Sequence, residues 1–218
     1  MTPLSRLHDI TPAIAPGFAV WPGDEAPSQQ WLCRIDAGAT VNLSSLRSTV
    51  HLGAHADAPL HYRADGRAMD ECPLDAFLGP ARVVRVAPEQ LGPQRRIPAE
   101  ALAPHLDAMP PRVLVATGTY APGTPYSDDF ASFSPEAIDL LAARGAVLVG
   151  IDTPSVDPLN DAALLSHGRL AAHGLMNLEG LVLEGVPVGD YELIALPLRL
   201  VGFDASPVRA VLRELSAP

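Results

Sequence analysis

The sequence predicts a mixed α/β protein with more than one layer of sheet. Its second half contains a β-α-β unit, made of an apolar strand at 112–117, a helix that begins at Ser134 and an apolar strand at 146–151. Such units place two parallel strands in one sheet with a right-handed crossover. The first half shows strands and turn signals with little helix. We therefore expect one α/β domain that spans residues 1–218.

Short runs of Val, Leu, Ile and Ala mark the strands. They lie at 82–86, 112–117, 146–151 and 192–196, and the last of them ends at Pro197. The two middle runs are apolar throughout and bounded by breakers, as is typical of buried parallel strands. A further apolar segment, Leu175 to Leu183, also reads as a strand and contains Glu179.

Two segments begin with the same helix start signal. Ser134-Pro135-Glu136 supplies an N-cap, a proline at the first helical position and an early acid, and Gly145 can end that helix. Ser206-Pro207 repeats the opening, and the apolar residues that follow at 208, 211, 212 and 215 recur at helical spacing. A third helix is expected from about Asp161 to His173, ended by Gly174. The sequence thus predicts three helices, one of them at the C-terminus.

The composition argues against several classes of protein. The net charge is −10 and no basic run is present, so a nucleic-acid partner is not expected. The chain contains no lysine, which argues against Schiff-base chemistry and a phosphate-binding P-loop. Its two cysteines, Cys33 and Cys72, form no C-x-x-C pair, so a zinc ribbon is not expected. The N-terminus lacks a secretory signal and no run approaches the ~20 apolar residues of a membrane span, which favours a cytoplasmic protein without a membrane partner.

The strongest sign of chemistry is a cluster of metal-binding residue types at alternate positions. It consists of His51, His55, Asp57 and His61. A straight strand would separate the first from the last by roughly 33 Å, which no single metal centre can span. Gly53 and Pro59 supply breaks at which the chain can bend. Imidazole and carboxylate groups are ligands of zinc, and also of manganese or iron.

A second group of candidates follows in the last third of the chain. His167 and His173 lie in the helix expected before Gly174, and Glu179 lies in the strand that follows. One of these histidines and Glu179 can converge if helix and strand run antiparallel, but the spacing does not decide between His167 and His173. An acid within an apolar strand normally needs a cation as its partner. Together the two groups offer more ligands than one open zinc site uses, so a centre with two metals is plausible.

The spacing of these residues resembles that of a known protein family. The pattern His51-x-Gly53-x-His55-x-Asp57-x-Pro59-x-His61 resembles the signature of the metal-dependent cyclase-like hydrolases. Further stretches resemble the bacterial kynurenine formamidase branch of that family: 21–24, 150–158, 178–181, 189–197 and 204–209. The resemblance extends from about Asp9 to Leu212.

The resemblance implies a three-layer β/β/α fold with a mixed sheet and a second antiparallel sheet, and a homodimer. It implies two Zn²⁺ ions per subunit, bound at His51, His55, Asp57, His167 and Glu179, with the two carboxylates bridging. It selects His167 over His173. It also implies that His61 transfers protons and that Trp21 lies at the substrate.

The activity that the resemblance implies is hydrolysis of N-formyl-L-kynurenine to formate and L-kynurenine, in tryptophan degradation. Zinc can lower the pKa of a bound water to about 7, which makes hydroxide available. His61 would then give a proton to the leaving arylamine, and Trp21 would stack on the aryl ketone. An arginine or backbone N–H groups would bind the substrate carboxylate, and the long connection 119–133 is a candidate lid. The alternatives are a hydrolase of the same family that opens a cyclic imide or an isatin-like ring, and a metal-binding module without turnover.

Overall fold

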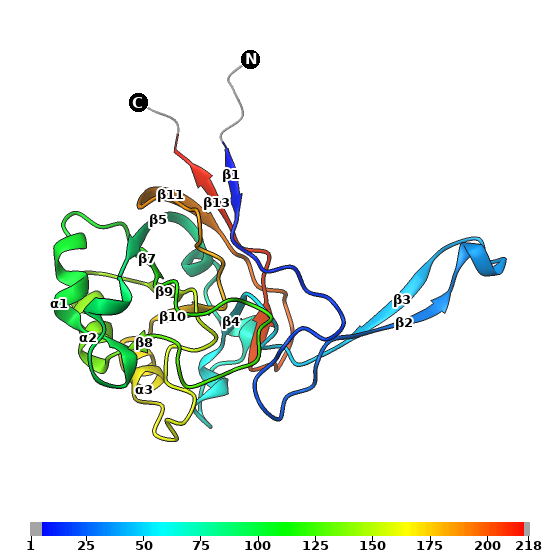
Figure 1. The fold of residues 1–218 in the computed structure, drawn as a ribbon, viewed down its shortest axis with the longest axis horizontal. Helices are drawn as coiled ribbons and strands as arrows, with labels where there is room; N and C mark the ends of the chain where they lie inside the picture. The colour runs from blue at the N-terminus through cyan, green and yellow to red at the C-terminus, as the bar shows by residue number, and fades with distance from the viewer. Residues whose placement is uncertain (1–5, 216–218) are drawn as a thin grey trace, which may run out of the picture.

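The computed structural model describes residues 6–215, and its main feature is one large, curled, mixed sheet (Figure 1). The strand order is β1-β13-β11-β5-β7-β9-β10-β4-β12. The four strands at its centre run parallel to one another: β5 (Leu78–Arg85), β7 (Arg112–Ala116), β9 (Leu148–Ile151) and β10 (Met176–Glu179). The outer strands join antiparallel: β1 (Leu7–Asp9), β4 (His55–Asp57), β11 (Gly189–Ile194), β12 (Ala205–Pro207) and β13 (Val211–Glu214).

The helices lie together beside this sheet, on the side opposite the region where the arm emerges in Figure 1. They are α1 (Ala99–Leu102), α2 (Pro135–Ala143) and α3 (Leu165–His173). Two small sheets complete the fold: β6 (Arg96–Ile97) with β8 (Ser132–Phe133) in parallel, and β2 (Ser28–Cys33) with β3 (Leu43–Arg47) in antiparallel orientation. The predicted α/β class, with a mixed sheet and a second antiparallel sheet, is confirmed.

The apolar core consists of two clusters, one on each face of the central strands, because successive side chains point to opposite faces. Val113 and Val115 of β7 pack into the cluster that includes the helix residues Ile138 and Leu141. Leu114, which lies between them in the sequence, joins the cluster on the other face of the sheet. Successive side chains of a strand point to opposite faces, so a strand that is apolar throughout can serve both clusters. This explains the continuous apolar run that the sequence shows here.

The β-α-β unit follows its prediction closely. The Ser134 side chain caps α2 by accepting a hydrogen bond from the Ala137 backbone N–H at 3.1 Å.

Gly174 ends α3 in the left-handed region, at φ +67°, where glycine has no Cβ to clash. That helix begins at Leu165 and not at Asp161, because Leu164 adopts φ +46° and interrupts the helical backbone.

The predicted C-terminal helix is wrong. The residues after Ser206-Pro207 form part of β12 and then β13. Strand β13 lies between β1 and β11, with Leu212 opposite His8 on one side and Leu193 on the other. One strand on each side, β1 and β11, supplies its backbone hydrogen bonds. This pairing outweighs the helical spacing of the apolar side chains.

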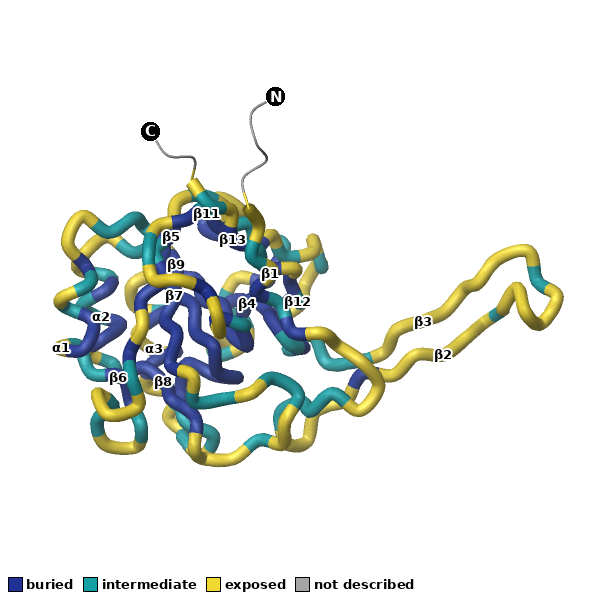
Figure 2. Tube along the Cα trace, turned by 45° about the horizontal axis from the view of Figure 1, so that its top comes forward, coloured by how far each residue is buried: buried dark blue, intermediate teal, exposed yellow. Residues whose placement is uncertain are grey.

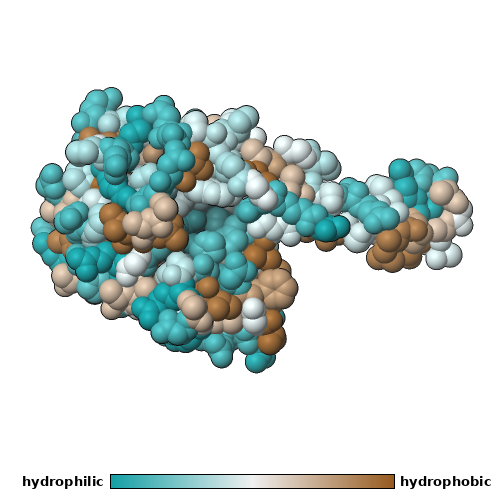
Figure 3. All heavy atoms as spheres, turned by 90° about the horizontal axis from the view of Figure 1, so that it is seen from below, coloured by the Kyte–Doolittle hydropathy of each residue, from teal (hydrophilic) through white to brown (hydrophobic). Residues whose placement is uncertain are grey.

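Strands β2 and β3 form an arm that projects far from the rest of the molecule (Figure 1). All but one of its strand residues are exposed, as the yellow tube in Figure 2 shows. Large apolar side chains are exposed on the arm: Trp31, Leu32, Ile35, Val41, Leu43 and Leu46. Apolar surface gathers near its outer end in Figure 3. An isolated two-stranded hairpin is at best marginally stable in water, so the arm is suited to packing against another surface.

Among the helices of residues 6–215, none has the length and apolar character needed to cross a membrane.

Candidate metal centre

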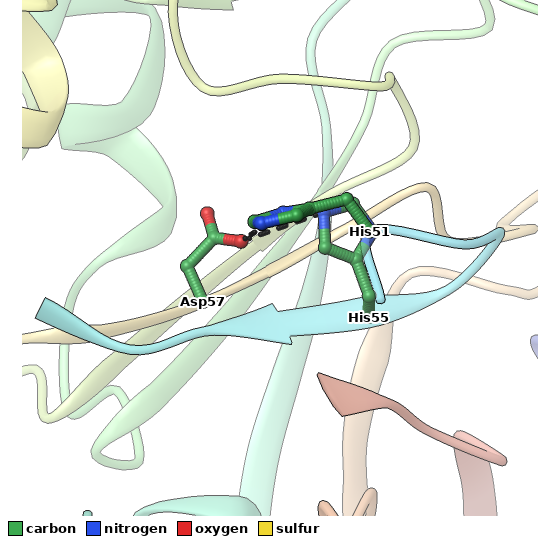
Figure 4. A group of neighbouring side chains, drawn as sticks. All are labelled: His51, His55 and Asp57. Atoms are coloured by element: carbon green, nitrogen blue, oxygen red, sulfur yellow. Dashed lines mark ion pairs between the residues drawn. The ribbon is translucent and has the colours of Figure 1, made fainter. Parts of the chain in front are cut away.

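The His51–His61 segment bends as its spacing requires. Only His55 to Asp57 form a strand, β4, and a 3-10 turn at Pro59–His61 follows it. Gly53 lies before the strand at φ +60°, in the left-handed region that glycine adopts readily. The bend brings the ring centroids of His51 and His61 to 4.1 Å. Figure 4 shows the side chains of His51, His55 and Asp57 on one side of β4.

The pairing of β4 with β10 gathers two more polar residues on that side. Glu179 lies opposite His55, and Asn177 lies opposite Asp57. Residues directly opposite each other in an antiparallel pair share a face of the sheet. Between them, Ala56 and Leu178 point the other way, into the apolar core. The alternation thus separates a polar face from an apolar one along the same two strands.

Helix α3 contributes His167 to this face. Its Nε2 lies 3.5 Å from Oδ2 of Asp57 and 3.5 Å from Oε1 of Glu179. The helix and strand converge as the sequence suggested. His173, the alternative left open by spacing, instead pairs with Asp139 on the surface at 2.7 Å.

Two sets of donor atoms share Asp57, and a third set joins His51 with His61 and Asp204. In one set, Oδ1 of Asp57 lies 3.0 Å from Nδ1 of His51 and 3.5 Å from Nε2 of His55. In the other, Oδ2 of Asp57 faces His167 and Glu179. Nε2 of His55 also lies 3.4 Å from Oε2 of Glu179, so Glu179 too faces both sets. Ligand atoms about 2.0–2.2 Å from one tetrahedral zinc ion lie roughly 3.3–3.6 Å apart, which these separations approach.

Two atoms of the cluster lack the partners that burial demands. Oδ1 of Asp57 and Nε2 of His167 are buried and make no hydrogen bond of good geometry within residues 6–215, although Oδ1 of Asp57 lies 3.0 Å from Nδ1 of His51. A buried polar atom without a partner costs free energy, and such atoms are rare in native proteins. Oδ1 of Asp57 faces His51 and His55, and Nε2 of His167 faces Asp57 and Glu179. The donor atoms therefore fit a bound metal.

The ionisation of the cluster also shows a demand for positive charge. Burial by itself would lower the pKa of His51, but the carboxylates of Asp57 and Asp204 outweigh it and raise that pKa to about 9. Burial likewise opposes charge on His167, and yet Asp157, Asp57 and Glu179 raise its pKa well above the ordinary value. The carboxylates of the cluster thus favour positive charge at its histidines, which is the charge that a metal ion would supply.

A cavity of about 410 Å³ opens onto the cluster. His51, His55, His61, His167 and Glu179 line its inner end. Its other walls include Trp21, whose ring lies 5.5 Å from that of Tyr126, and apolar side chains of the 154–164 segment. The structure thus brings every candidate site residue of the sequence together: His51, His55, Asp57, His61, His167 and Glu179 in or beside the cluster, and Trp21 at the wall.

The sequence missed residues that hold the cluster in place. Asn177 donates to Oδ2 of Asp57 at 2.7 Å, and the backbone N–H of Val156 donates to Oε1 of Glu179 at 2.8 Å. Asp157 accepts from Nδ1 of His167 at 2.8 Å and from buried Arg96 at 3.1 Å. Asp157 lies in a stretch that carried the family resemblance, and that was the one signal that could have marked it.

Comparison with known proteins places these features in context. A model of the cyclase family, described as "Putative cyclase", matches residues 8–158. A solved structure of a potential metal-dependent hydrolase with cyclase activity is 28% identical, with a TM-score of 0.81 over 97% of this chain and 99% of that one. A predicted metal-dependent hydrolase from Bacillus stearothermophilus is 30% identical, with a TM-score of 0.78 over 95% of this chain and 97% of that one. Isatin hydrolase A from Labrenzia aggregata, bound to benzyl benzoate, shares the fold at 24% identity, with a TM-score of 0.75 over 95% and 93% of the two chains.

Proposed function

The chain belongs to the cyclase family, and from that premise we propose that it hydrolyses N-formyl-L-kynurenine to formate and L-kynurenine, as a metal-dependent arylformamidase of tryptophan degradation. The observation that most supports a metal-dependent hydrolase is the pair of donor sets that share Asp57 beside a cavity. The choice of an arylformamide rests on the aromatic wall of that cavity and on the resemblance of the sequence.

The metal-binding role falls to five side chains. His51, His55, Asp57, His167 and Glu179 would hold two zinc ions, with Asp57 and Glu179 shared between them. When bound, zinc supplies a Lewis acid for the amide carbonyl and activates water for attack at neutral pH. Asn177 and the Val156 N–H fix the shared carboxylates, so that their oxygens keep their directions when the cation enters.

His61 is the group that would move the proton. It lies beside His51, and its side chain is 35% exposed toward the cavity, so that a bound substrate can reach it. An arylamine leaves an amide only if its nitrogen is protonated as the bond breaks. His61 is outside the two donor sets that share Asp57, and a histidine that is not used as a ligand there is free to transfer a proton.

The cavity wall supports an aromatic substrate that carries an ammonium group. Trp21 and Tyr126 offer ring faces and edges against which an aryl ketone can pack. Asp24 also lines the cavity and would favour the α-ammonium group, whereas Asp161, a second acid of the wall, already pairs with Arg96. Among residues 6–215 no arginine lines it, but Thr49 and Ser155 do, so their hydroxyls join backbone N–H groups as candidates for binding the substrate carboxylate.

The first experiment is to measure formate and kynurenine release from N-formyl-L-kynurenine by the purified protein. Release should stop in chelator and return with added zinc. If the fully zinc-loaded protein releases neither product, the formamidase proposal is wrong. Isatin then becomes the next substrate, because ring opening yields one product where formamide cleavage yields two.

His61→Ala separates an enzyme from a metal-binding module. We expect it to retain zinc while turnover falls by about 10²–10⁴-fold, the usual contribution of a general acid or base. His173→Ala is the matched control, because that histidine lies in the surface pair with Asp139. A parent protein that binds zinc and turns over no amide would support the binding module.

We also propose that the arm of β2 and β3 packs against a second copy of the chain in a homodimer. Trp31 is 46% and Leu46 is 71% exposed on it, and apolar side chains that emerge so far from the body favour burial at an interface. Light scattering should report a dimer for the parent and a monomer for Trp31→Ser/Leu46→Ser. Val147→Ser, an exposed apolar residue just before β9, is the control and should stay dimeric. A monomeric parent protein would contradict the proposal.

A further inference from the structure

The three histidines of the cluster share one arrangement of their ring nitrogens. In each, one nitrogen faces the carboxylates of Asp57 or Glu179, and the other is held by an oxygen outside the two donor sets that share Asp57. Nδ1 of His55 donates to the carbonyl oxygen of Gly53 at 2.9 Å, and Nδ1 of His167 donates to Asp157 at 2.8 Å. Nε2 of His51 donates to Oδ2 of Asp204 at 3.0 Å. Such outer bonds fix which nitrogen of a histidine is left to bind a metal.

The backbone around Asp204 is fixed on both sides. Its carbonyl oxygen accepts from the Ala58 N–H at 2.8 Å, directly before β12 pairs with β4. Two residues earlier, the Gly202 N–H donates to the Asp70 side chain at 2.9 Å. The Asp204 carboxylate is therefore presented to β4 by the sheet itself, although it lies 153 residues from His51 in the sequence.

The same carboxylate oxygen also faces His61. Oδ2 of Asp204 lies 3.5 Å from Nδ1 of His61, while the two imidazole rings are 4.1 Å apart. One oxygen thus stands between the candidate metal ligand and the candidate proton-transfer group. With Nδ1 of His61 turned toward Asp204, its Nε2 is the nitrogen left for a substrate.

We propose that Asp204 is a positioning residue that sets the ring orientation of both His51 and His61. It leaves Nδ1 of His51 for the metal and Nε2 of His61 for the leaving group. The part that concerns His51 needs only a metal, whereas the part that concerns His61 rests on the proposed function.

The test compares Asp204→Asn with Asp70→Ala. Asp204→Asn keeps the shape but removes the charge, whereas Asp70→Ala loosens the same turn without touching a histidine of the cluster. Zinc affinity of the apoprotein is measured by competition with a chelator, and needs no substrate. We expect Asp204→Asn to weaken zinc binding about 10–100-fold, as loss of such an outer partner usually does. Asp70→Ala should retain the affinity of the parent.

The second readout is the split between kcat and KM. Asp204→Asn, saturated with zinc, should show a lower kcat with KM within about two-fold of the parent, because asparagine keeps the shape of the cavity wall to which Asp204 belongs, and the main loss falls on proton transfer. Three results would overturn the proposal: an unchanged zinc affinity, an equal loss in Asp70→Ala, or the loss of one whole zinc equivalent at saturation. The last would make Asp204 a ligand. A protein without turnover, but with the expected affinities, would reject the formamidase and keep the role toward His51.

A measurement on the unmutated protein guards against a variant that fails to fold. In the protein loaded with ¹¹³Cd and labelled with ¹⁵N-histidine, the cadmium coupling should appear at Nδ1 of His51. Coupling at Nε2 would contradict the proposal, since that nitrogen donates to Asp204 in the arrangement described here.

Discussion

Replacing Gly180 by alanine should damage the metal centre without removing any of its side chains. Gly180 follows Glu179 at φ +66°, and a Cβ built there would lie 2.2 Å from the carbonyl oxygen of Gly53. That oxygen accepts the hydrogen bond from Nδ1 of His55 at 2.9 Å. The obstructing atom belongs to the backbone, so no change of rotamer can relieve the overlap. The segment that carries His55 must move away from β10.

The expected magnitude has two parts. An alanine held in the left-handed region costs about 1–2 kcal/mol, and forcing extra volume into a packed position costs about 1–3 kcal/mol. Gly180→Ala should therefore lower the free energy of unfolding by about 2–5 kcal/mol. Gly174→Ala isolates the first part, because Gly174 has nearly the same φ, +67°, and a Cβ there would meet no atom within 4 Å.

Urea denaturation of both variants in chelator measures this difference directly, and a zinc titration of the folded proteins follows. Gly180→Ala should be the less stable variant by at least about 1 kcal/mol, and it alone should bind zinc more weakly. Equal destabilisation of the two variants, with unchanged zinc binding in both, would refute the reasoning about close approach.

Three further outcomes follow from buried groups. Asp152 accepts hydrogen bonds from the backbone N–H groups of Thr117 and Gly118, so Asp152→Ala, which removes that acceptor, should cost about 1–3 kcal/mol in urea denaturation at neutral pH. Burial raises the pKa of Asp152 above its ordinary 3.8. A proton on this carboxyl therefore stabilises the fold fully below pH 3.8, and the stabilisation is lost as the pH rises through the raised pKa of the folded state. Asp152→Asn should remove this part of the dependence of unfolding free energy on pH. Burial also raises the pKa of the Cys72 thiol, so thiol reagents should label Cys33 in the native protein and Cys72 only after unfolding. Finally, chelation should lower the Tm of the parent, and zinc in excess should restore it.

The ligands on one short segment could be predicted from their spacing, whereas Asp157 and Asp204, which orient them, lie in stretches marked only by the family resemblance. His51, His55 and Asp57 stand at spacings that are visible in the sequence, and Gly53 marks the bend. Asp204 lies 153 residues from the histidine it contacts, and no local pattern connects the two. Spacing also left His167 and His173 equal, because only the packing of α3 against β10 decides which of them turns inward.

The mistaken C-terminal helix shows the same limit at the level of the fold. The apolar residues from Val208 to Leu215 fit a helical period, and Ser206-Pro207 is a good helix start. The strand that forms instead depends on β1, about 200 residues earlier, where Leu7 pairs with Arg213. A local signal can therefore be overruled by pairing partners that the sequence does not reveal.

The pairing of β4 with β10 links the fold to the chemistry. It puts the carboxylates of Asp57 and Glu179 on one face of the sheet, where their side chains are 0% and 5% exposed. Two buried carboxylates this close raise the free energy of the folded state unless cations offset their charge. The apolar residues between them, Ala56 and Leu178, hold the same strands together through the core. The register that buries the core thus also forces the two acids together, so the fold itself creates the demand for metal that the proposed reaction would use.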